Sequence, residues 1–388
     1  MQINASPRPV SRREVLISAT VGTLGYLIGR RVEGFDAQLV KTAVNRGVRW
    51  LLRQQASDGG WHSETYGNMR DGAGNTALIL AAWSQIPAEQ HAETREAYER
   101  GIRFLTTNLD TAGLARPRTG IADYPVFATA LLLTALKQRP AAVVPDVIAR
   151  MCRGLAFAQR SSATGWSEEH PDFGGWGLTV DRDVDKDPAS PSNLSSTAAA
   201  LTALKSHAAL RPEAVRDVLT FLTRCQNTES DGADAGGFAF TVRPEDSLNK
   251  AGWRRTKSGV VRPIPYPSAT CDGVIALWAS GVALDGDQLA AAITWLVNSS
   301  SPETDGNRGF REWLVFYEAQ AWAKVCRLTR HPQLLLAHRR HVERLLSCQR
   351  SDGSWSNAFF EMREDDPLIA TACALLALTE ISAPTSEK

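Results

Sequence analysis

The sequence contains few of the residues from which metal centres and disulfide frameworks are built. Its 388 residues include seven histidines and six cysteines, and no two cysteines form a CxxC pair. Most of the cysteines stand in apolar runs with helical spacing, so we expect free, buried thiols and no resident metal or other cofactor. They are Cys152, Cys225, Cys271, Cys326, Cys348 and Cys373.

The chain also lacks an excess of charge of either sign. Lysine and arginine together number 43, and aspartate and glutamate 42. A nearly neutral chain creates no field that attracts nucleic acid or anionic lipid, so neither is expected as a partner. Sustained alternation of apolar and polar residues between hairpin turns is scarce too, which argues against a β-sheet protein.

The N-terminal segment has an apolar run, but it is too short to span a bilayer comfortably. Arg12 and Arg13 follow a polar start, and the run ISATVGTLGYLI ends at Ile28. This order resembles a twin-arginine export signal and implies export of the folded chain to the periplasm. No clear cleavage site follows, so residues 1–33 are predicted as a signal that can remain as a weak membrane tether. An ordinary basic, flexible N-terminus is the alternative.

From about Phe35 onward, apolar residues recur at spacings of three and four, the pattern of amphipathic helices. About a dozen such segments are predicted. They run through 39–52, 77–83, 98–105, 126–136, 144–158, 197–204, 215–222, 274–282, 289–297, 313–325, 334–346 and 369–378.

A glycine-rich corner recurs between these segments. Residues 55–61 read QASDGGW and residues 349–355 read QRSDGSW, and weaker versions end at Trp166, Trp176, Phe238 and Phe310. Each corner joins a longer, charged helix to a shorter, alanine-rich one. Small residues suit a helix packed on both sides, so we predict six helix pairs in a ring, with the shorter helices inside and the corner aromatics on the outside.

These corners resemble the QW repeats of squalene-hopene cyclases and the related repeats of protein prenyltransferase β-subunits. The likeness covers about residues 36–380. It implies an all-α (α/α)6 toroid of about twelve helices, with a central cavity lined by the N-terminal ends of the inner helices. We therefore predict one domain, 34–383, followed by a tail, 384–388. The same architecture hosts several chemistries, so the repeat specifies the fold better than the reaction.

In class II cyclases of this group, the middle acid of a D-x-D-D motif at the start of an inner helix protonates an alkene. The local match here is Asn193-Leu194-Ser195-Ser196-Thr197-Ala198, with Ser195 at the position of the proton donor. A serine hydroxyl is far too weak an acid for that step, so cyclase activity is not expected at this position. Asn193 and Ser195 remain candidates for ligand binding.

The likeness to prenyltransferase β-subunits suggests two further residues. Lys250 matches a diphosphate-contacting lysine and Asp272 a zinc-ligating aspartate, but the other two zinc ligands fall on Val274 and Ala370. One surviving ligand does not hold zinc, so zinc-dependent prenylation is not expected. The alternating Asp181, Asp183, Asp185 and Asp187 suit either a calcium site or, more simply, a solvated loop.

The acidic run Glu364-Asp365-Asp366 before Pro367 is the strongest acidic cluster at an expected start of an inner helix. Proline suits the first helical turn, so Asp366 should be the N-cap, with a lowered pKa, which leaves Asp365 or Glu364 as the freer acid. We predict Asp365, Asp366 and then Asp272 as catalytic acids, and Glu364 as a ligand contact. Capping alone, without catalysis, is the alternative.

Aromatic and basic side chains supply the remaining candidates. Aromatic rings that face a cavity stabilise carbocations. Those on the expected inner helices are Trp83, Trp278, Phe316, Tyr317 and Trp322, of which Trp278 and Tyr317 are predicted to bind ligand, with core packing as the alternative. Lys250, Arg254, Arg255 and Lys257 suit either a diphosphate or a solvated insertion.

Two classes of function follow from these patterns. The first is a terpene-cyclase or prenyltransferase-like protein that binds an isoprenoid lipid in a central cavity, with proton-initiated cyclisation as the reaction. The second is an exported toroid that binds lipid, peptide or glycan without catalysis. A glycan-active enzyme ranks third, and a polar cleft with paired carboxylates would favour it.

Overall fold

The computed structural model describes residues 37–86, 88–115, 123–180, 190–228, 232, 234–243, 248–255, 259–300, 314–360 and 362–380. This part of the chain contains twelve α-helices and one two-stranded sheet. The all-α prediction is therefore confirmed. Each of the twelve segments with helical spacing overlaps one of these helices. The predicted signal, residues 1–33, and the acidic run from Asp181 to Asp187 lie outside the described residues.

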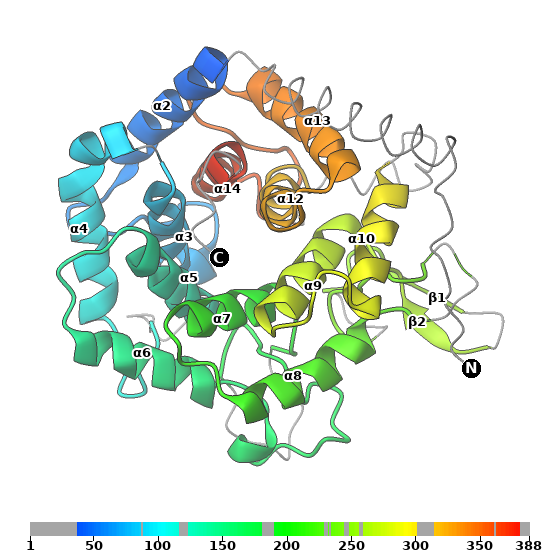
Figure 1. Ribbon diagram of the computed structural model, residues 1–388. Coiled ribbons are helices and arrows are strands. Elements are labelled where there is room, and N and C mark those ends of the chain that lie inside the picture. Colours follow the sequence, from blue (N-terminus) through cyan, green and yellow to red (C-terminus); the bar gives the residue numbers. More distant parts are fainter. Residues whose placement is uncertain are drawn as a thin grey trace, which may run out of the picture.

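The helices form two concentric rings (Figure 1). The outer ring consists of α2 (Ala37–Gln54), α4 (His91–Thr107), α6 (Pro145–Phe157), α8 (Pro212–Cys225), α10 (Asp287–Ser299) and α13 (Pro332–Cys348). The inner ring consists of α3 (Ala73–Ser84), α5 (Pro125–Gln138), α7 (Leu194–Ser206), α9 (Pro267–Ala279), α12 (Phe316–Thr329) and α14 (Pro367–Thr379). The rings close where α14 packs against α3 and α13 against α2. The fold is the predicted (α/α)6 toroid.

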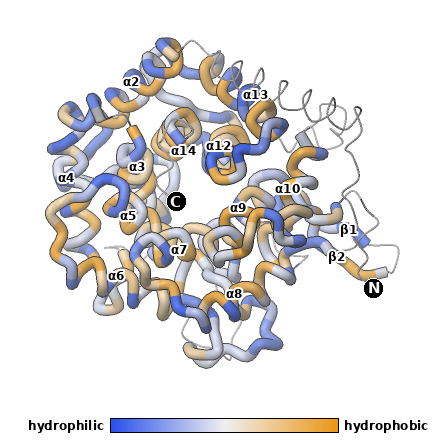
Figure 2. Tube along the Cα trace, viewed as in Figure 1, coloured by the Kyte–Doolittle hydropathy of each residue, from blue (hydrophilic) through white to orange (hydrophobic). Residues whose placement is uncertain are grey.

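The inner helices are more completely buried than the outer ones, as their alanine-rich composition predicts. Every residue of α3 is buried, whereas α2 buries only one face, which includes Val44, Val48 and Leu51. Along the outer helices, hydrophilic and hydrophobic residues alternate, as Figure 2 shows. An inner helix contacts neighbours on both sides and an outer ring behind it, so alanine and other small residues allow the close approach.

The recurring corner links each helix pair to the next one. Gln55 donates from Nε2 to the carbonyl oxygens of Gly59 and of Ala97 in α4, both at 2.8 Å. Gln349 makes the matching bonds to Gly353 and to Ala43 of α2, both at 2.9 Å. The second pair of bonds therefore joins the last repeat to the first.

The corner glycines are required for the same closure. Gly174 has φ +88°, and a Cβ there would collide with the carbonyl oxygen of Asp217 in α8. The left-handed backbone and the close approach both exclude a side chain.

The corner aromatics are buried between the two rings, so the prediction that they lie on the outside is wrong. The Trp61 backbone N–H donates to Thr76 Oγ1 of α3 at 2.9 Å, and its indole N–H donates to Leu51 O of α2 at 2.8 Å. Trp176 and Trp355 bond inner-helix threonines and outer-helix carbonyls in the same way. Each of these tryptophans thus joins the end of an outer helix, through its indole, to the start of the following inner helix, through its backbone N–H.

A short hairpin was not predicted. Strands β1 (Trp253–Arg255) and β2 (Val261–Pro263) pair antiparallel within the long insertion before α9 and project from the toroid (Figure 1). Both strands are three residues long, too short to show the alternation of apolar and polar residues by which a strand is predicted from sequence.

Five of the six cysteines are buried free thiols, as expected, and Cys348 is exposed. No described helix has the length and apolar character needed to cross a membrane.

Candidate active site

A small cavity of about 80 Å³ lies at the centre of the toroid and is lined by all six inner helices. Its apolar wall consists mainly of Leu78, Phe127, Leu131, Ile275, Trp278 and Leu376. Its polar groups gather in two places: Ser195, Asp272 and Tyr317 stand in the N-terminal halves of their helices, and Gln85, Gln138, Lys324, Arg327 and Glu380 lie towards the C-terminal ends. The cavity is smaller than the roughly 300–1,000 Å³ typical of ligand sites.

Asp272 is a buried acid that faces this cavity. It stands in the second turn of α9 and is 4% exposed. Tyr317 Oη, from the first turn of α12, donates a hydrogen bond to Asp272 Oδ2 at 2.9 Å. Ser195, at the start of α7, lines the same cavity. Three predicted site residues on three neighbouring inner helices are thus brought together.

Burial governs the protonation of this group. Loss of solvent raises the pKa of Asp272 to about 7, although the Tyr317 hydrogen bond and the Lys324 charge act in the opposite direction. A carboxyl with this pKa is largely protonated in mildly acidic solution and exchanges its proton near neutrality, which is the property a general acid needs. The pKa of Tyr317 is also raised, first by burial and then by the Asp272 charge, so the phenol keeps its proton.

The acidic run Glu364-Asp365-Asp366 has a different environment. The Glu364 carboxylate is fully buried and accepts hydrogen bonds from the backbone N–H groups of Val315, Phe316 and Tyr317 at 2.8 to 3.0 Å. It caps the start of α12, and its oxygens are occupied by these amides. The expectation that Glu364 is a freer acid is therefore wrong.

Asp366 is the N-cap of α14, as predicted. It accepts from Leu368 N at 2.9 Å and from Ser63 Oγ. Its pKa is raised, contrary to the prediction, because burial outweighs these hydrogen bonds. Asp365 is half-buried and accepts a hydrogen bond from Tyr66 Oη. Neither side chain lines the central cavity.

Other loops before the inner helices are also joined by capping and stacking. Asp123, in the loop before α5, accepts from the N–H groups of Ala73 and Gly74 at the start of α3, and burial raises its pKa to about 6. The Arg363 guanidinium lies 5.0 Å from the Tyr66 ring and 5.3 Å from the Tyr124 ring. These contacts connect the loops that lead into α3, α5 and α14.

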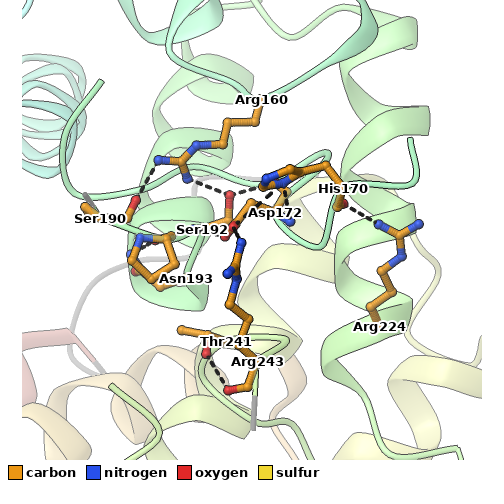
Figure 3. Close-up of polar contacts among 10 residues, drawn as sticks. Arg160, His170, Asp172, Ser190, Ser192, Asn193, Arg224, Thr241 and Arg243 are labelled. Carbon is orange, nitrogen blue, oxygen red and sulfur yellow. Dashed lines mark hydrogen bonds and ion pairs between the residues drawn. The ribbon is translucent and has the colours of Figure 1, made fainter. Parts of the chain in front are cut away.

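Asn193 is a structural residue of α7. It is the N-cap, and its Oδ1 accepts from Ser196 N and from Ser195 Oγ, both at 3.0 Å. Figure 3 shows the polar network that precedes it, in which Arg160 donates to Ser192 Oγ and Asp172 pairs with Arg243. Ser192 Oγ accepts from Arg160 and donates to the Asp172 carbonyl oxygen, both at 2.8 Å, so this group supports the start of α7.

Of the predicted basic and aromatic candidates, some line the central cavity, and the others lie in the insertion or between the two rings. Lys250, Arg254 and Arg255 belong to the outer insertion, where Arg254 pairs with Asp234. Of the aromatics, Trp278 and Tyr317 line the cavity. Trp83 packs edge-on against Trp61, and Trp322 donates to Leu334 O of α13, so both lie between the rings.

Sequence reasoning missed the polar C-terminal end of the cavity. Arg327 Nε donates to Glu380 Oε1 at 2.7 Å, and Gln320 and Lys324 line the same wall. The spacing of Tyr317, Gln320, Lys324 and Arg327 places them on one face of α12, and continuing that face from Tyr317 would have identified them. Among the described residues, no three His, Cys, Asp or Glu side chains gather as a metal site.

No protein-family model and no curated protein matches this sequence. Solved structures do match. The type II terpene cyclase MstE from Scytonema aligns with a TM-score of 0.59 and 14% identity over 89% of this chain and 98% of that chain. A protein from Actinoplanes aligns with a TM-score of 0.56 and 18% identity over 89% and 100% of the two chains.

Cellobiose 2-epimerase from Spirochaeta thermophila DSM 6192 aligns with a TM-score of 0.57 and 14% identity over 91% of this chain and 98% of that chain. Proteins acting on a lipid-like substrate and on a sugar thus share one architecture, and identities this low carry over no substrate. The resemblance stated from the sequence is confirmed for the fold: the chain has the (α/α)6 toroid of the terpene cyclase-like proteins.

Proposed function

We propose that the chain is an isomerase of the terpene-cyclase type, in which Asp272 protonates an unsaturated isoprenoid ligand in the central cavity. The observation that carries this proposal is the position of Asp272: its carboxyl is buried, lines the cavity, has a pKa of about 7 and is oriented by Tyr317. In this proposal Asp272 takes the role that Ser195 cannot perform, from the neighbouring inner helix and about one turn deeper.

The proposed reaction is an isomerisation, so substrate and product have the same molecular formula. The Asp272 O–H bond breaks and a C–H bond forms on one alkene carbon, which leaves a carbocation on the other. A second alkene of the same ligand attacks the cation, and the product then loses one proton to water or to the Asp272 carboxylate. One proton enters and one leaves, so no cofactor or second substrate is required.

The cavity wall supports a cationic intermediate. The rings of Phe127, Trp278 and Tyr317 line the same space as the Asp272 carboxyl. Aromatic faces attract a cation that has lost its water. Geranylgeranyl dihydroxybenzoate is a substrate of the structurally similar cyclase MstE, which supports the isoprenoid class as the first choice here.

The cavity volume favours a second candidate, a toroid that binds a small ligand without catalysis. A space of about 80 Å³ is below the roughly 150 Å³ of a cavity that accepts benzene. A ligand of 15 or 20 carbons therefore requires the inner helices or their loops to separate. The glycan-active alternative receives less support, because a disaccharide is also too large and much of the wall is apolar.

Solvent deuterium distinguishes these candidates. The full-length protein is incubated in D2O with isoprenoid alcohols of 5 to 20 carbons and with geranylgeranyl dihydroxybenzoate, and products are analysed by mass spectrometry. We expect a product with one deuterium bound to carbon, and a rate at least about 100-fold lower in Asp272→Asn. Binding without deuterium incorporation would refute the isomerase and leave the binding toroid.

A matched variant controls for folding in this experiment. Asp217→Asn changes a buried carboxylate of α8 that accepts from Ser162, away from the cavity. It should keep the turnover of the unmodified protein. Equal loss of turnover in both variants would mean that Asp272→Asn acts through general damage to the fold.

A further inference from the structure

The end of the cavity opposite Asp272 contains buried oxygen atoms whose hydrogen-bonding capacity is unused. Glu380, the C-cap of α14, is 2% exposed, and its Oε1 accepts from Arg327. Its Oε2 is buried and accepts no hydrogen bond from any described residue. Gln85 Oε1, at the C-cap of α3, shares this condition within the described chain, and so does Gln320 Oε1, which stands three residues after Tyr317 in α12 and therefore nearer to Asp272. All three side chains line the central cavity.

These atoms come from three consecutive inner helices. Gln320 belongs to α12, Glu380 caps α14, and Gln85 caps α3. Helix α14 packs against both α12 and α3 (Figure 1), and all three side chains line the same cavity. A buried acceptor without a donor is destabilising and rare in folded proteins, so three in one small cavity are an unusual arrangement for packing alone.

We infer that this end of the cavity is a subsite for the hydroxyl group of the ligand, which makes the ligand an unsaturated alcohol. The inference rests on the proposed function for the alkene end alone. A carboxylate oxygen such as Glu380 Oε2 only accepts hydrogen bonds, so its ligand group must donate. The hydroxyl donates to Glu380 or Gln320 while its oxygen accepts from Lys324.

The surrounding charges select a neutral head group. Lys324 stands one turn after Gln320 on the same face of α12 and lines the cavity, and the Arg327 guanidinium lies three residues farther on. Two cations disfavour an ammonium group. Glu380 and the two glutamine oxygens disfavour a carboxylate or phosphate, because each would place lone pairs against lone pairs. A hydroxyl group suits both the cations and the acceptor oxygens, because it can accept a hydrogen bond from Lys324 and donate one to a carboxylate or amide oxygen.

The subsite also orients the ligand relative to Asp272. Tyr317 and Lys324 are seven residues apart in α12, which corresponds to about 10 Å along the helix axis. A hydroxyl near Lys324 therefore places a double bond several carbon atoms away beside the Asp272 carboxyl. This geometry predicts that protonation occurs at the end of the ligand remote from the alcohol.

Paired probes test the inference. Geraniol and 3-methyl-2-buten-1-ol are each compared with the corresponding methyl ether, and their dissociation constants for the full-length protein are measured by titration calorimetry. The ether keeps the oxygen and the carbon skeleton but donates no hydrogen bond. We expect each alcohol to bind about tenfold more tightly than its ether. Equal affinities, or tighter binding of 3-methyl-2-butenoate than of the alcohol, would overturn the inference.

Three glutamine variants locate the effect. Gln85→Met and Gln320→Met should reduce the alcohol preference to about twofold or less. Gln138→Met is the control, because Gln138 also lines the cavity but its Oε1 already accepts from Ser84 Oγ at 2.7 Å, so the preference should persist. Gln320→Met should also raise the melting temperature, since it removes a buried acceptor without a donor. A lower melting temperature with an unchanged preference would show that Gln320 is only structural.

The same titrations in Asp272→Asn separate this inference from the proposed reaction. That variant should keep the alcohol preference, because Asp272 lies nearer the other end of its cavity-lining face. If the preference holds while no deuterium is incorporated, the alcohol subsite stands and the isomerase fails. If deuterium is incorporated while alcohols and ethers bind equally, the isomerase stands and the subsite fails.

Discussion

Asp272 and Glu364 are both buried acids beside the same helix, α12, yet they serve different purposes. Glu364 accepts three backbone N–H groups at the start of α12, whereas Asp272 accepts one phenolic hydroxyl from that helix, Tyr317. Burial raises the pKa of both carboxyls. The Asp272 carboxyl lines a cavity, and the Glu364 carboxyl does not.

The difference shows why burial does not by itself identify a catalytic acid. A carboxylate whose oxygens are occupied by several backbone N–H groups is held by the fold, and a ligand cannot reach it. A carboxyl that has one partner and faces a cavity retains an O–H for a ligand. The triplet at 364–366 contains more acidic residues, and the single Asp272 has the more suitable surroundings.

Replacing Glu364 should produce the largest change in stability. Glu364→Ala leaves the N–H groups of Val315, Phe316 and Tyr317 without their acceptor in a buried position, so the free energy of unfolding should fall by about 3 kcal/mol or more. Urea denaturation followed by circular dichroism measures it. Asp272→Asn should cost much less, and a larger loss in that variant would reverse the proposed comparison.

The pH dependence of stability should distinguish Asp272 from its neighbours. Because its pKa is raised from 3.8 to about 7 in the folded chain, the folded state binds more protons than the unfolded state between those values. The free energy of unfolding should therefore fall as pH rises from about 4 to 7, at up to about 1.4 kcal/mol per pH unit from this group.

Asp272→Asn should remove this part of the slope. Asp123, whose pKa is raised to about 6, contributes a slope of the same sign to both proteins and cancels in their difference. Stability measured at half-unit pH intervals gives the two curves. Parallel curves from pH 4 to 7 would show that Asp272 is not protonated in the folded state near neutrality.

The sequence was sufficient to predict the toroid because the signals for it are local and repeated. The glutamine, glycine and aromatic residues of each corner make their bonds within one corner or to the next helix, as Gln55 and Trp61 do. The N-cap role of Asp366 followed from Pro367 in the same way. Helical spacing predicted each helix, and most predicted ends lie within one or two residues of the observed ones, although a few differ by up to seven.

The site was harder to predict because its residues lie far apart in the sequence and come together only when the inner ring of helices forms. Ser195, Asp272 and Tyr317 are separated by 45 or more positions, and no local rule reports that α7, α9 and α12 present them to one cavity. The acidic triplet stood out in the sequence because its members are adjacent. Adjacent residues along a loop point in different directions, and two of the three acids became caps.

The smallest expected effects concern the other two acids of the triplet. Asp366→Ala removes an N-cap that accepts from Leu368 N, so it should cost about 1 kcal/mol and leave turnover unchanged. Asp365→Asn keeps an oxygen that can accept from Tyr66 Oη, so its melting temperature should hardly change. Because neither carboxylate lines the cavity, deuterium incorporation and alcohol binding should match those of the unmodified protein in both variants. Loss of turnover in Asp365→Asn at an unchanged melting temperature would move the catalytic acid to the loop before α14 and refute the role proposed for Asp272.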